Sequence, residues 1–367
     1  MLKLKIHHFI TTISIGGAEN QLLILARAQV KLGYKVVIYP MKDSLDLKDQ
    51  LTMCGAEVDT RFHEKNIFKQ IYISFKMNFD NYEILHAHLP LAEIIQYFSR
   101  CRIKITSRHF GGKFYPKMPR IVSTALSRIV SYRTTYVVAI SDFVKDYLRI
   151  SNEIPINKKI YVVKYGFKVE DFLNQKSQTI DSKHAKARLA CGTLARLSPE
   201  KDLATLLKAI HVLKIDYNEK IEVNIYGVGP EEENLRSLVK KLHIDNQVNF
   251  KGKTNQPLEA FDTFEIFVLT SVFEGFGMVL LEAMSLGKKI VCSEIPAAKE
   301  ILGNKGAGIF FETGNEYDLA CKISNISNLL HSSYLDLQKI QLEQFSATKM
   351  AAEMDKIYLQ ALSGWDK

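Results

Sequence analysis

The feature that most constrains the fold of this chain is a regular alternation of two hydrophobic patterns. Short runs rich in β-branched residues, such as "LKIHHFI" (4–10) and "KVVIYPM" (35–41), alternate with longer segments such as "GGAENQLLILARAQVKLGY" (16–34), whose apolar residues recur at helical spacing. The short runs are typical of buried strands, and the longer segments are typical of amphipathic helices. This alternation predicts an α/β protein with parallel sheets that are covered by helices.

The alternation is interrupted by the polar stretch "NQKSQTIDSKHAK" (174–186), which has the composition of a linker. We therefore predict a doubly wound, Rossmann-like domain over 1–170, a linker over 171–186 and a second such domain over 187–345. Residues 346–367 are expected to form a helix that packs back on the first domain. A chain of 367 residues, 47% of them hydrophobic, is long enough for two cores. We expect the two domains to face each other across a cleft, with ligands at the carboxyl ends of the strands.

Cysteine content and hydropathy limit where the protein is expected to work. Its five cysteines are scattered and include no C-x-x-C pair, which fits a reducing compartment and argues against a metal site built on thiolates. Lys3, Lys5, His7 and His8 interrupt the N-terminal apolar residues, so a signal peptide is not expected. The sequence contains no run of about 18 apolar residues. We expect a cytoplasmic protein without a membrane-spanning segment.

Positive charge is concentrated in the first half of the chain. Residues 1–170 contain 26 Lys and Arg against 14 Asp and Glu. Residues 94–141 contain no acidic residue and nine basic ones: Arg100, Arg102, Lys104, Arg108, Lys113, Lys117, Arg120, Arg128 and Arg133. This stretch is either a solvated surface or a patch for an anionic partner, namely a membrane surface, a polyprenyl-diphosphate carrier or nucleic acid. The aromatic residues of "HFGGKFYPKM" (109–118) favour a membrane interface, and no nucleic-acid motif accompanies them.

The segment "GTLARLSPEKDLATLLKAI" (192–210) pairs two basic residues with a predicted helix start. Ser198 is predicted to be the N-cap and Pro199 the first helical residue. Lys201 would then lie in the first turn, where a cation opposes the helix dipole. An anion bound by Arg196 and Lys201 would explain this placement. The alternative is an exposed lysine beside an arginine in a surface salt bridge.

The segment "VFEGFGMVLLEAMSLG" (272–287) places two carboxylates in different settings. Glu274 lies in a glycine-rich turn after a predicted strand, and Glu282 lies about one turn into a helix that is predicted from Met278 to Gly287. The amides at the start of this helix form an anion site. Carboxylates accept hydrogen bonds from sugar hydroxyls, so Glu274 and Glu282 are predicted to bind the sugar and the ribose of a nucleotide sugar. The alternative is that Glu282 is an ordinary helical surface residue.

Two further glycine-rich segments carry weaker signals. In "SIGGAEN" (14–20), Gly16 and Gly17 would let the backbone approach a phosphate or a sugar, although an ordinary tight turn has the same sequence. The segment "YGVGPEEE" (226–233) lacks the third glycine of a dinucleotide fingerprint. A nicotinamide site is therefore not predicted there.

Several motifs in order resemble those of the retaining family 4 glycosyltransferases, which have the GT-B fold. The most specific are "GTLARLSPEKD" (192–202) and the E-x7-E element in "EGFGMVLLEAMSLGKKIVCSE" (274–294), and "GGAE" (16–19), "LHAH" (85–88) and "TSRHFG" (106–111) precede them. The chain departs from the family pattern at "YGFK", where Tyr165 and Lys168 replace an Asn and an Asp. This departure affects the interdomain turn.

The resemblance implies roles for individual residues. The residues expected to be catalytic are Glu274, His109, Arg196 and Lys201. The residues expected to bind the nucleotide sugar are Gly16, Gly17, Arg196, Lys201, Glu274, Phe276, Gly277, Met278, Val279 and Glu282. By the resemblance, Arg196 and Lys201 would neutralise the diphosphate, and His109 would contact the donor sugar. His86 is expected to be a core residue.

The resemblance predicts a retaining hexosyltransferase that uses a nucleotide sugar, with UDP-hexose or UDP-HexNAc favoured and GDP-mannose left open. The acceptor is expected to be a glycan or a polyprenyl-linked glycan, as in surface polysaccharide synthesis, at the inner face of the cell membrane. No cofactor is expected, and the absence of a D-x-D sequence argues against an essential metal. The alternatives are a nucleotide-sugar epimerase of GT-B fold and a non-catalytic GT-B scaffold.

Overall fold

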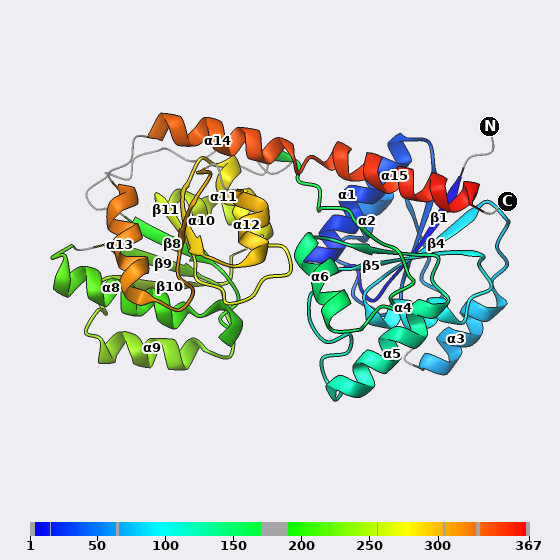
Figure 1. The fold of residues 1–367 in the computed structure, drawn as a ribbon, viewed down its shortest axis with the longest axis horizontal. Coiled ribbons are helices and arrows are strands. Elements are labelled where there is room, and N and C mark those ends of the chain that lie inside the picture. The colour runs from blue at the N-terminus through cyan, green and yellow to red at the C-terminus, as the bar shows by residue number, and fades with distance from the viewer. Residues whose placement is uncertain are drawn as a thin grey trace. The chain divides into compact units, whose positions relative to one another are not determined.

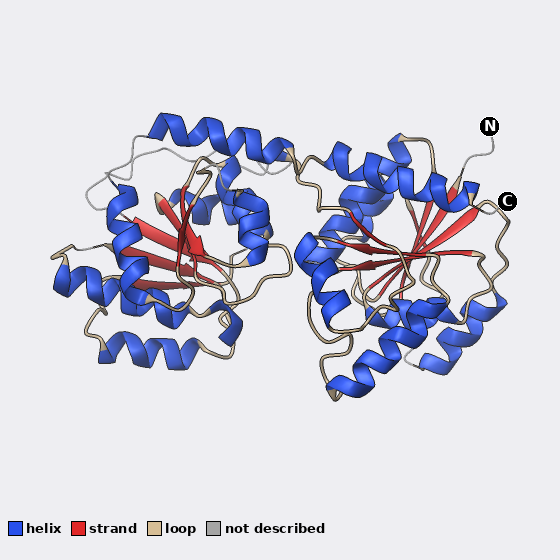
Figure 2. Cartoon of the chain, viewed as in Figure 1, coloured by secondary structure: helices blue, strands red, loops and turns tan. Residues whose placement is uncertain are grey.

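The computed structural model describes residues 4–14, 16–63, 66–169, 190–219, 221–254, 256–303, 306–327 and 331–364. The chain divides into two compact units, one of residues 1–167 with 345–367 and one of residues 168–344. Each contains a parallel sheet with helices on both faces (Figures 1 and 2). The predicted α/β class with two doubly wound sheets is confirmed. The linker predicted over 171–186 lies outside the described residues.

The first unit is built on a seven-stranded parallel sheet in the order β3-β2-β1-β4-β5-β6-β7. Its elements in chain order are β1 (Lys5–Ile10), α1 (Gly17–Lys31), β2 (Lys35–Pro40), α2 (Lys48–Met53), β3 (Glu57–Val58), α3 (Ile67–Lys76), β4 (Glu83–His88), α4 (Pro90–Tyr97), β5 (Ile103–Arg108), α5 (Arg120–Tyr132), β6 (Tyr136–Ala139), α6 (Asp142–Ile150), β7 (Ile160–Val162) and α15 (Ala347–Ser363). Helices α1, α2 and α15 cover one face, and α3, α4 and α5 cover the other (Figure 1).

The second unit is built on a six-stranded parallel sheet in the order β10-β9-β8-β11-β12-β13. Its elements are β8 (Ala190–Leu194), the 3₁₀ turn η1 (Pro199–Lys201), α8 (Leu203–Asp216), β9 (Glu222–Tyr226), α9 (Glu232–Lys241), β10 (Val248–Gly252), α10 (Pro257–Asp262), β11 (Ile266–Leu269), α11 (Met278–Ser285), β12 (Lys289–Ser293), α12 (Pro296–Leu302), β13 (Ile309–Phe311), α13 (Glu316–Ser327) and α14 (His331–Glu343). Helices α8, α9 and α13 lie on one face of this sheet, and α10, α11, α12 and α14 lie on the other (Figure 1).

The C-terminal helix α15 belongs to the first unit although it follows the second unit in the sequence. The chain returns beside the point where it left, since the amide of Phe167 donates to the carbonyl of Phe345 at 2.6 Å. Helix α15 packs against α1. Its residues Met350, Met354 and Tyr358 join the buried cluster between α1 and the sheet. The core of the first unit is therefore incomplete without residues from the end of the chain.

The strand order of each sheet reverses once, between β1 and β4 in the first unit and between β8 and β11 in the second. At such a point the loops that follow the two neighbouring strands diverge and leave a crevice outside the carboxyl ends of the strands. Most of the site residues predicted from the sequence lie on loops that follow these strands or on the helices that those loops begin.

Candidate active site

In the second unit, the loops after β8 and β11 are held together by hydrogen bonds to main-chain carbonyls. The hydroxyl of Thr270 donates to the carbonyl of Lys201 at 2.8 Å, and the amide of Val272 donates to the carbonyl of Glu200 at 2.9 Å. Because β8 and β11 are neighbours at the reversal point, these bonds bring the two predicted motifs side by side. Lys201 lies on the first loop and Glu274 on the second.

The centre of this arrangement is an ion pair between Lys201 and Glu274. The ammonium nitrogen of Lys201 lies 2.5 Å from Oε1 of Glu274, and both side chains are mostly buried. The hydroxyl of Ser271 donates to the same oxygen at 2.8 Å. The second oxygen, Oε2, makes no hydrogen bond with any residue that the structure describes. The pair therefore orients one carboxylate oxygen and leaves the other able to accept bonds from a ligand.

The predicted helix start at Ser198 is wrong. Residues Pro199–Lys201 form a 3₁₀ turn, and helix α8 begins only at Leu203. Asp202 separates the two because its backbone is left-handed, with φ of 42°, a conformation that cannot continue a helix. The hydroxyl of Ser198 bonds to Glu200 at 2.6 Å instead of capping. Lys201 thus precedes the α-helix, and its charge is balanced by Glu274 and not placed against a helix dipole.

Arg196 lies on the same loop and extends into solvent. Its guanidinium makes no ion pair or hydrogen bond with another described residue, and its side chain is exposed. The backbone on either side is fixed, since the amide of Leu197 donates to the carbonyl of Val228 at 3.1 Å. An added Cβ at Gly227 or Gly229 would lie within 1.8 Å or 2.2 Å of a carbonyl oxygen of this loop. The "YGVG" segment is therefore needed for close packing against the loop that carries Arg196.

The second predicted motif has the geometry expected from its sequence. Helix α11 runs from Met278 to Ser285, and its N-cap Gly277 has φ of 93°. Glycine adopts this left-handed conformation without steric cost, whereas other residues are strained there. Gly287, just beyond the helix, also has positive φ. Of the four residues predicted to present main chain to a ligand, Phe276 is buried, whereas Gly277, Met278 and Val279 remain partly accessible.

Glu282 occupies the second turn of α11 and differs from Glu274 in its surroundings. Its side chain is partly buried, and it has no hydrogen bond or ion pair with another described residue. Burial raises the pKa of this carboxyl from 4.5 to about 7, because the charged form is poorly solvated there. An unpaired carboxylate in such a place is able to accept hydrogen bonds from a ligand that brings its own donors.

The remaining predicted residues, Gly16, Gly17 and His109, lie in the first unit. Gly16 is the N-cap of α1, which Gly17 begins. A Cβ at Gly16 would come within 2.5 Å of the Glu19 carboxylate, which accepts a bond of 2.8 Å from Thr12. A side chain at Gly16 would therefore require the Glu19 side chain to move.

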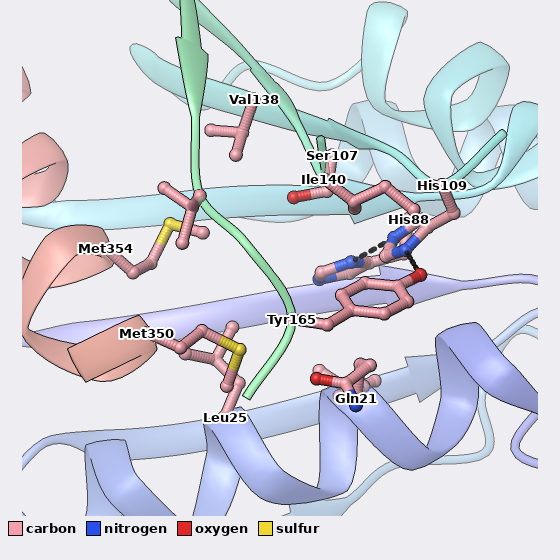
Figure 3. A pocket seen from close by; sticks show the side chains of 12 residues that line it. Gln21, Leu25, His88, Ser107, His109, Val138, Ile140, Tyr165, Met350 and Met354 are labelled. Carbon is pink, nitrogen blue, oxygen red and sulfur yellow. Dashed lines mark hydrogen bonds between the residues drawn. The ribbon is translucent and has the colours of Figure 1, made fainter. Parts of the chain in front are cut away.

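His109 directly follows β5, and both of its ring nitrogens are engaged. Nδ1 lies 2.5 Å from the hydroxyl of Tyr165, and Nε2 lies 3.0 Å from Nδ1 of His88 (Figure 3). Burial lowers the pKa of His109 to about 3, so the ring is neutral at physiological pH. His86 is buried, as expected of a core residue, and bonds to Tyr358 and Ser107.

Two family profiles match this sequence. The profile described as Glycosyltransferase Family 4 matches residues 15–171, and the profile described as Glycosyl transferases group 1 matches residues 176–333. The chain belongs to the glycosyltransferases of this group 1 and family 4 type. The first profile falls almost entirely within the first unit and the second within the second unit.

Individual proteins that resemble this glycosyltransferase chain agree with that assignment. The N-acetylgalactosamine-N,N'-diacetylbacillosaminyl-diphospho-undecaprenol 4-alpha-N-acetylgalactosaminyltransferase of Campylobacter jejuni is 28% identical over 170 residues. That match covers 46% of this chain and 46% of the relative, so the chain spans about half the length of the relative it matches.

Several solved structures resemble nearly the whole chain, and two of them illustrate the likeness. A glycosyltransferase from Rickettsia africae has a TM-score of 0.78 at 20% identity and covers 99% of both chains. The Anabaena protein Alr3699/HepE, solved in complex with UDP, has a TM-score of 0.76 at 17% identity and covers 97% of this chain and 100% of its own. At such identities the likeness shows the fold, and the GT-B fold expected from the motifs is confirmed.

The residues that hold the predicted site in place are not indicated by sequence motifs. Ser271 was not singled out although it directly follows Thr270 at the end of β11 and bonds to Glu274. Tyr165 was noted only as a departure from the family turn, whereas the structure places its hydroxyl on His109. A polar residue within three positions of a predicted site residue was the available signal for Ser271. For Tyr165 there was none, because 56 residues separate it from His109.

Proposed function

We propose that this chain is a retaining glycosyltransferase that moves a hexose or N-acetylhexosamine from a UDP-sugar to a glycan or polyprenyl-linked acceptor. The observation that carries the proposal is the Lys201–Glu274 pair at the reversal point of the second sheet, beside the glycine turn that begins α11. The Anabaena neighbour was solved with UDP, which supports the donor class. The Campylobacter relative is named for transfer to a diphospho-undecaprenol-linked sugar, which supports the acceptor class.

Positive charge near the departing diphosphate is the first requirement of this reaction. When the bond between the anomeric carbon and the diphosphate breaks, negative charge grows on the leaving oxygen. Arg196, which is unpaired among the described residues, and Lys201 are assigned to stabilise that charge. The proposed reaction needs no metal ion, since these two cations supply the positive charge.

The two carboxylates are assigned to opposite ends of the donor. Glu274, with Oε1 held by Lys201 and Ser271, would accept bonds from hydroxyls of the transferred sugar through Oε2. Glu282 would accept bonds from the ribose hydroxyls, which replace the solvation that this carboxylate lacks. The main chain from Phe276 to Val279 would contact the sugar and the phosphates between them.

The proposed stereochemistry follows from the absence of a predicted carboxylate nucleophile. The acceptor hydroxyl would attack the anomeric carbon on the face from which UDP departs. The carbon–oxygen bond to the β-phosphate breaks, the bond to the acceptor oxygen forms, and the hydroxyl proton passes to the departing phosphate oxygen. The anomeric configuration of the sugar is then retained.

The experiment that tests the proposal is incubation of the full chain with a panel of UDP-sugars, with and without a polyprenyl-diphosphate glycan. UDP release that requires the acceptor, with an α-linked product from an α-linked donor by NMR, supports the proposal. Activity that persists in EDTA supports the assignment of the positive charge to Arg196 and Lys201. Acceptor-independent formation of an epimeric sugar would point to an epimerase, and no turnover with any donor would point to a scaffold.

We further propose that the first unit binds an anionic membrane surface, where a polyprenyl-linked acceptor would be presented. Helices α3 and α5 flank α4 on one face of the sheet (Figure 1). Both helices expose apolar residues and bury polar ones. On α5 the buried positions include Ser123, Ser127 and Ser131, whereas Ile121 and Tyr132 are 84% and 73% exposed.

The same inversion occurs on α3. Its buried residues Gln70 and Ser74 bond to main-chain carbonyls of neighbouring segments, the Gln70 amide to Met41 at 2.7 Å and the Ser74 hydroxyl to Ile95 at 3.1 Å. Its exposed residues include Phe68, which is 78% exposed, and Tyr72. Exposed apolar side chains beside basic ones are typical of surfaces that insert shallowly into a lipid headgroup layer.

Two of the nine basic residues in the acid-free stretch 94–141 do not contribute to this surface. Lys104 is buried and donates to the carbonyl of Ser99 at 2.8 Å. Arg108 is buried between Glu93 at 2.9 Å and Glu153 at 3.2 Å. The other seven basic residues of the stretch are exposed. None of the described helices is long and apolar enough to cross a bilayer.

A further inference from the structure

The first unit contains eight side chains that are hydrogen bonded end to end in its interior. In order they are Tyr165, His109, His88, His8, Gln29, Tyr358, His86 and Ser107, joined by seven contacts of 2.5–3.0 Å. We call this set the histidine chain. All are buried except His109, which is partly exposed. They come from β1, β4 and β5, from α1 and α15, and from the segments after β5 and β7.

A metal site is the first alternative for such a cluster. His8, His86 and His88 have ring nitrogens within 4.8 Å of one another, close enough to hold one ion. However, all six of their ring nitrogens already have a hydrogen-bond partner within the chain. An ion would have to displace several of these bonds in a buried place, where unpaired polar groups are costly. Hydrogen bonding, and not metal binding, is the chemistry that this cluster fits.

Burial and hydrogen bonding together determine which ring nitrogen of each histidine carries the proton. Burial lowers the pKa of His8 to about 4 and those of His86 and His88 well below the usual value, so each ring is neutral and carries one N–H. A contact between two ring nitrogens needs one donor and one acceptor. Once one histidine in the run His8–His88–His109 has a defined N–H, the other two are therefore determined.

Gln29 determines which nitrogen of His8 carries the proton. Its carbonyl oxygen Oε1 lies 2.8 Å from Nε2 of His8, and its amide nitrogen donates to the hydroxyl of Tyr358 at 3.0 Å. His8 must then carry its proton on Nε2, and so must His88 and His109 in turn. On the other side of Gln29, Tyr358 has accepted a bond and donates to Nδ1 of His86, which again leaves the proton on Nε2.

We propose that Gln29 is a positioning residue, which joins the two halves of the histidine chain into a single directed series of hydrogen bonds and thereby holds the ring of His109 in one tautomer and one orientation. Gln29 itself lies three side chains away from His109. The Gln29 amide has one donor group and one acceptor group. The direction of the hydrogen bonds in one half of the histidine chain can therefore be reversed only if the direction in the other half is reversed as well.

Both ends of the histidine chain reach the same cavity. Tyr165 and Ser107 line it together with His88 and His109, and its other walls are mostly apolar (Figure 3). Both ring nitrogens of His109 are engaged in hydrogen bonds. The ring therefore has no nitrogen available for a ligand unless one of these hydrogen bonds is broken. The ring of His109 is thus held by a network that includes residues of α1 and α15.

The test is the tautomeric state of the histidines in the full chain, measured by long-range ¹⁵N–¹H NMR of histidine-labelled protein. Each ring nitrogen reports directly whether it carries a proton. We expect His8, His86, His88 and His109 all to be protonated on Nε2 alone at neutral pH. A proton on Nδ1 of any of the four, or a doubly protonated ring, would overturn the proposal.

Two variants separate a positioning role from ordinary packing. In Gln29→Leu, His8 loses its acceptor, and an N–H without a partner is more costly than a lone pair without one. We expect the three histidines His8, His88 and His109 to lose the Nε2 proton together. Gln29→Glu should keep it on all three, because a carboxylate oxygen still accepts from His8. A change confined to His8, or no change in Gln29→Leu, would contradict the proposal.

A control variant and an activity measurement complete the experiment. Leu23→Ala removes buried volume from the same helix, in a hydrophobic cluster that contains no member of the histidine chain, and all four tautomers should stay as in the parent. With regard to transfer, the inference rests on the proposed function. Gln29→Leu should lower kcat by roughly tenfold while KM for the donor stays within about twofold. If the parent protein shows no transferase activity, the proposed function fails while the NMR result still decides the role of Gln29. If the tautomers change as expected but kcat stays the same, the histidine chain does not position His109 for the reaction.

Discussion

At the scale of single residues, the ion pair between Lys201 and Glu274 links the diphosphate end of the proposed donor site to the sugar end. Lys201→Ala removes one cation from the leaving group and also leaves the Glu274 carboxylate with only Ser271. We expect kcat/KM to fall by roughly 10²–10³-fold, the range for loss of one preorganised donor to developing charge. Steady-state kinetics measures this effect. Lys208→Ala, on the exposed side of α8, is the matched control and should stay near the parent value; near-full activity in Lys201→Ala would refute the assignment.

The two carboxylates are predicted to differ in what they bind. Glu274→Ala should damage transfer while leaving the affinity for UDP nearly unchanged, because it is assigned to the sugar. Glu282→Ala should weaken UDP binding, because it is assigned to the ribose. Calorimetry with UDP on both variants separates these roles, and equal losses of affinity would show that the division is wrong.

The raised pKa of Glu282 predicts a pH dependence of donor binding. Ribose hydroxyls donate to the ionised carboxylate, so affinity for a UDP-sugar should rise by up to about tenfold between pH 6 and pH 8, as the group with a pKa of about 7 loses its proton. The pyrophosphate diester of a UDP-sugar does not titrate between pH 6 and pH 8. A UDP-sugar is therefore better suited to this measurement than UDP. Glu282→Gln should bind with an affinity independent of pH. An equal slope in both proteins would assign the titration to another group.

The raised pKa of Glu282 also affects the free energy of unfolding, which falls with rising pH while the affinity for the donor increases. A carboxyl whose pKa is higher in the folded protein binds its proton more tightly there than in the unfolded chain. The contribution of Glu282 to the free energy of unfolding is therefore full below pH 4.5 and is lost as the pH rises through about 7. Glu282→Gln should remove this loss, which denaturant titrations at pH 5 and pH 8 would detect.

At the scale of secondary-structure elements, the inverted faces of α3 and α5 predict membrane binding that depends on charge. Each basic residue near an anionic leaflet contributes on the order of 1 kcal/mol. Changing Lys113, Lys117 and Arg120 to Glu should abolish co-sedimentation with vesicles that contain anionic lipid, and about 0.5 M salt should strip the parent protein. Nucleotide binding should be unaffected.

Charge reversal at a distant place controls for the net charge of the protein. Lys240, Lys241 and Lys251 are exposed on the second unit, and changing them to Glu gives the same change in charge. This variant should bind vesicles like the parent. Equal binding of the parent to neutral and anionic vesicles, or loss of binding in both triple variants, would leave α5 as a solvated surface.

The elements of this fold were predictable to different degrees from their sequences. Buried parallel strands such as β2 and β11 give nearly continuous apolar runs, which identified them. Helix α5 could not be oriented in this way. Its isoleucines would be assigned to the core, yet Ser127 is buried because its hydroxyl accepts a bond of 2.9 Å from Arg108, itself buried with two carboxylates. Such a partner is distant in sequence, so no local pattern reveals it.

The candidate site was predictable where one segment carried the chemistry and not where two segments met. Glu274, Gly277 and Glu282 were found because they lie within nine residues of one another. The pairing of Lys201 with Glu274 depends on the order of strands in the sheet, which sequence patterns do not give. The left-handed backbone at Asp202 moved the helix start beyond Lys201 for a reason equally invisible in the sequence.

At the scale of the whole molecule, the packing of α15 predicts that the first unit depends on the end of the chain. Met354 is 4% exposed within the cluster that α15 shares with α1 and the sheet, whereas Leu359 on the same helix is 52% exposed. Met354→Ala should lower the free energy of unfolding of the first unit by about 2–5 kcal/mol. Leu359→Ala should change it little. Denaturant unfolding followed by signals from the first unit measures both, and equal effects would show that α15 does not contribute to the core.

The return of the chain at Phe345 also has a consequence during synthesis. A ribosome makes the segment 168–344 in full before it makes α15, which supplies Tyr358 and Met354 to the first unit. The second unit is therefore able to complete its core on the nascent chain while the first still lacks a helix. We therefore expect the first unit of this protein to complete its core last, whereas in co-translational folding the N-terminal domain usually finishes first.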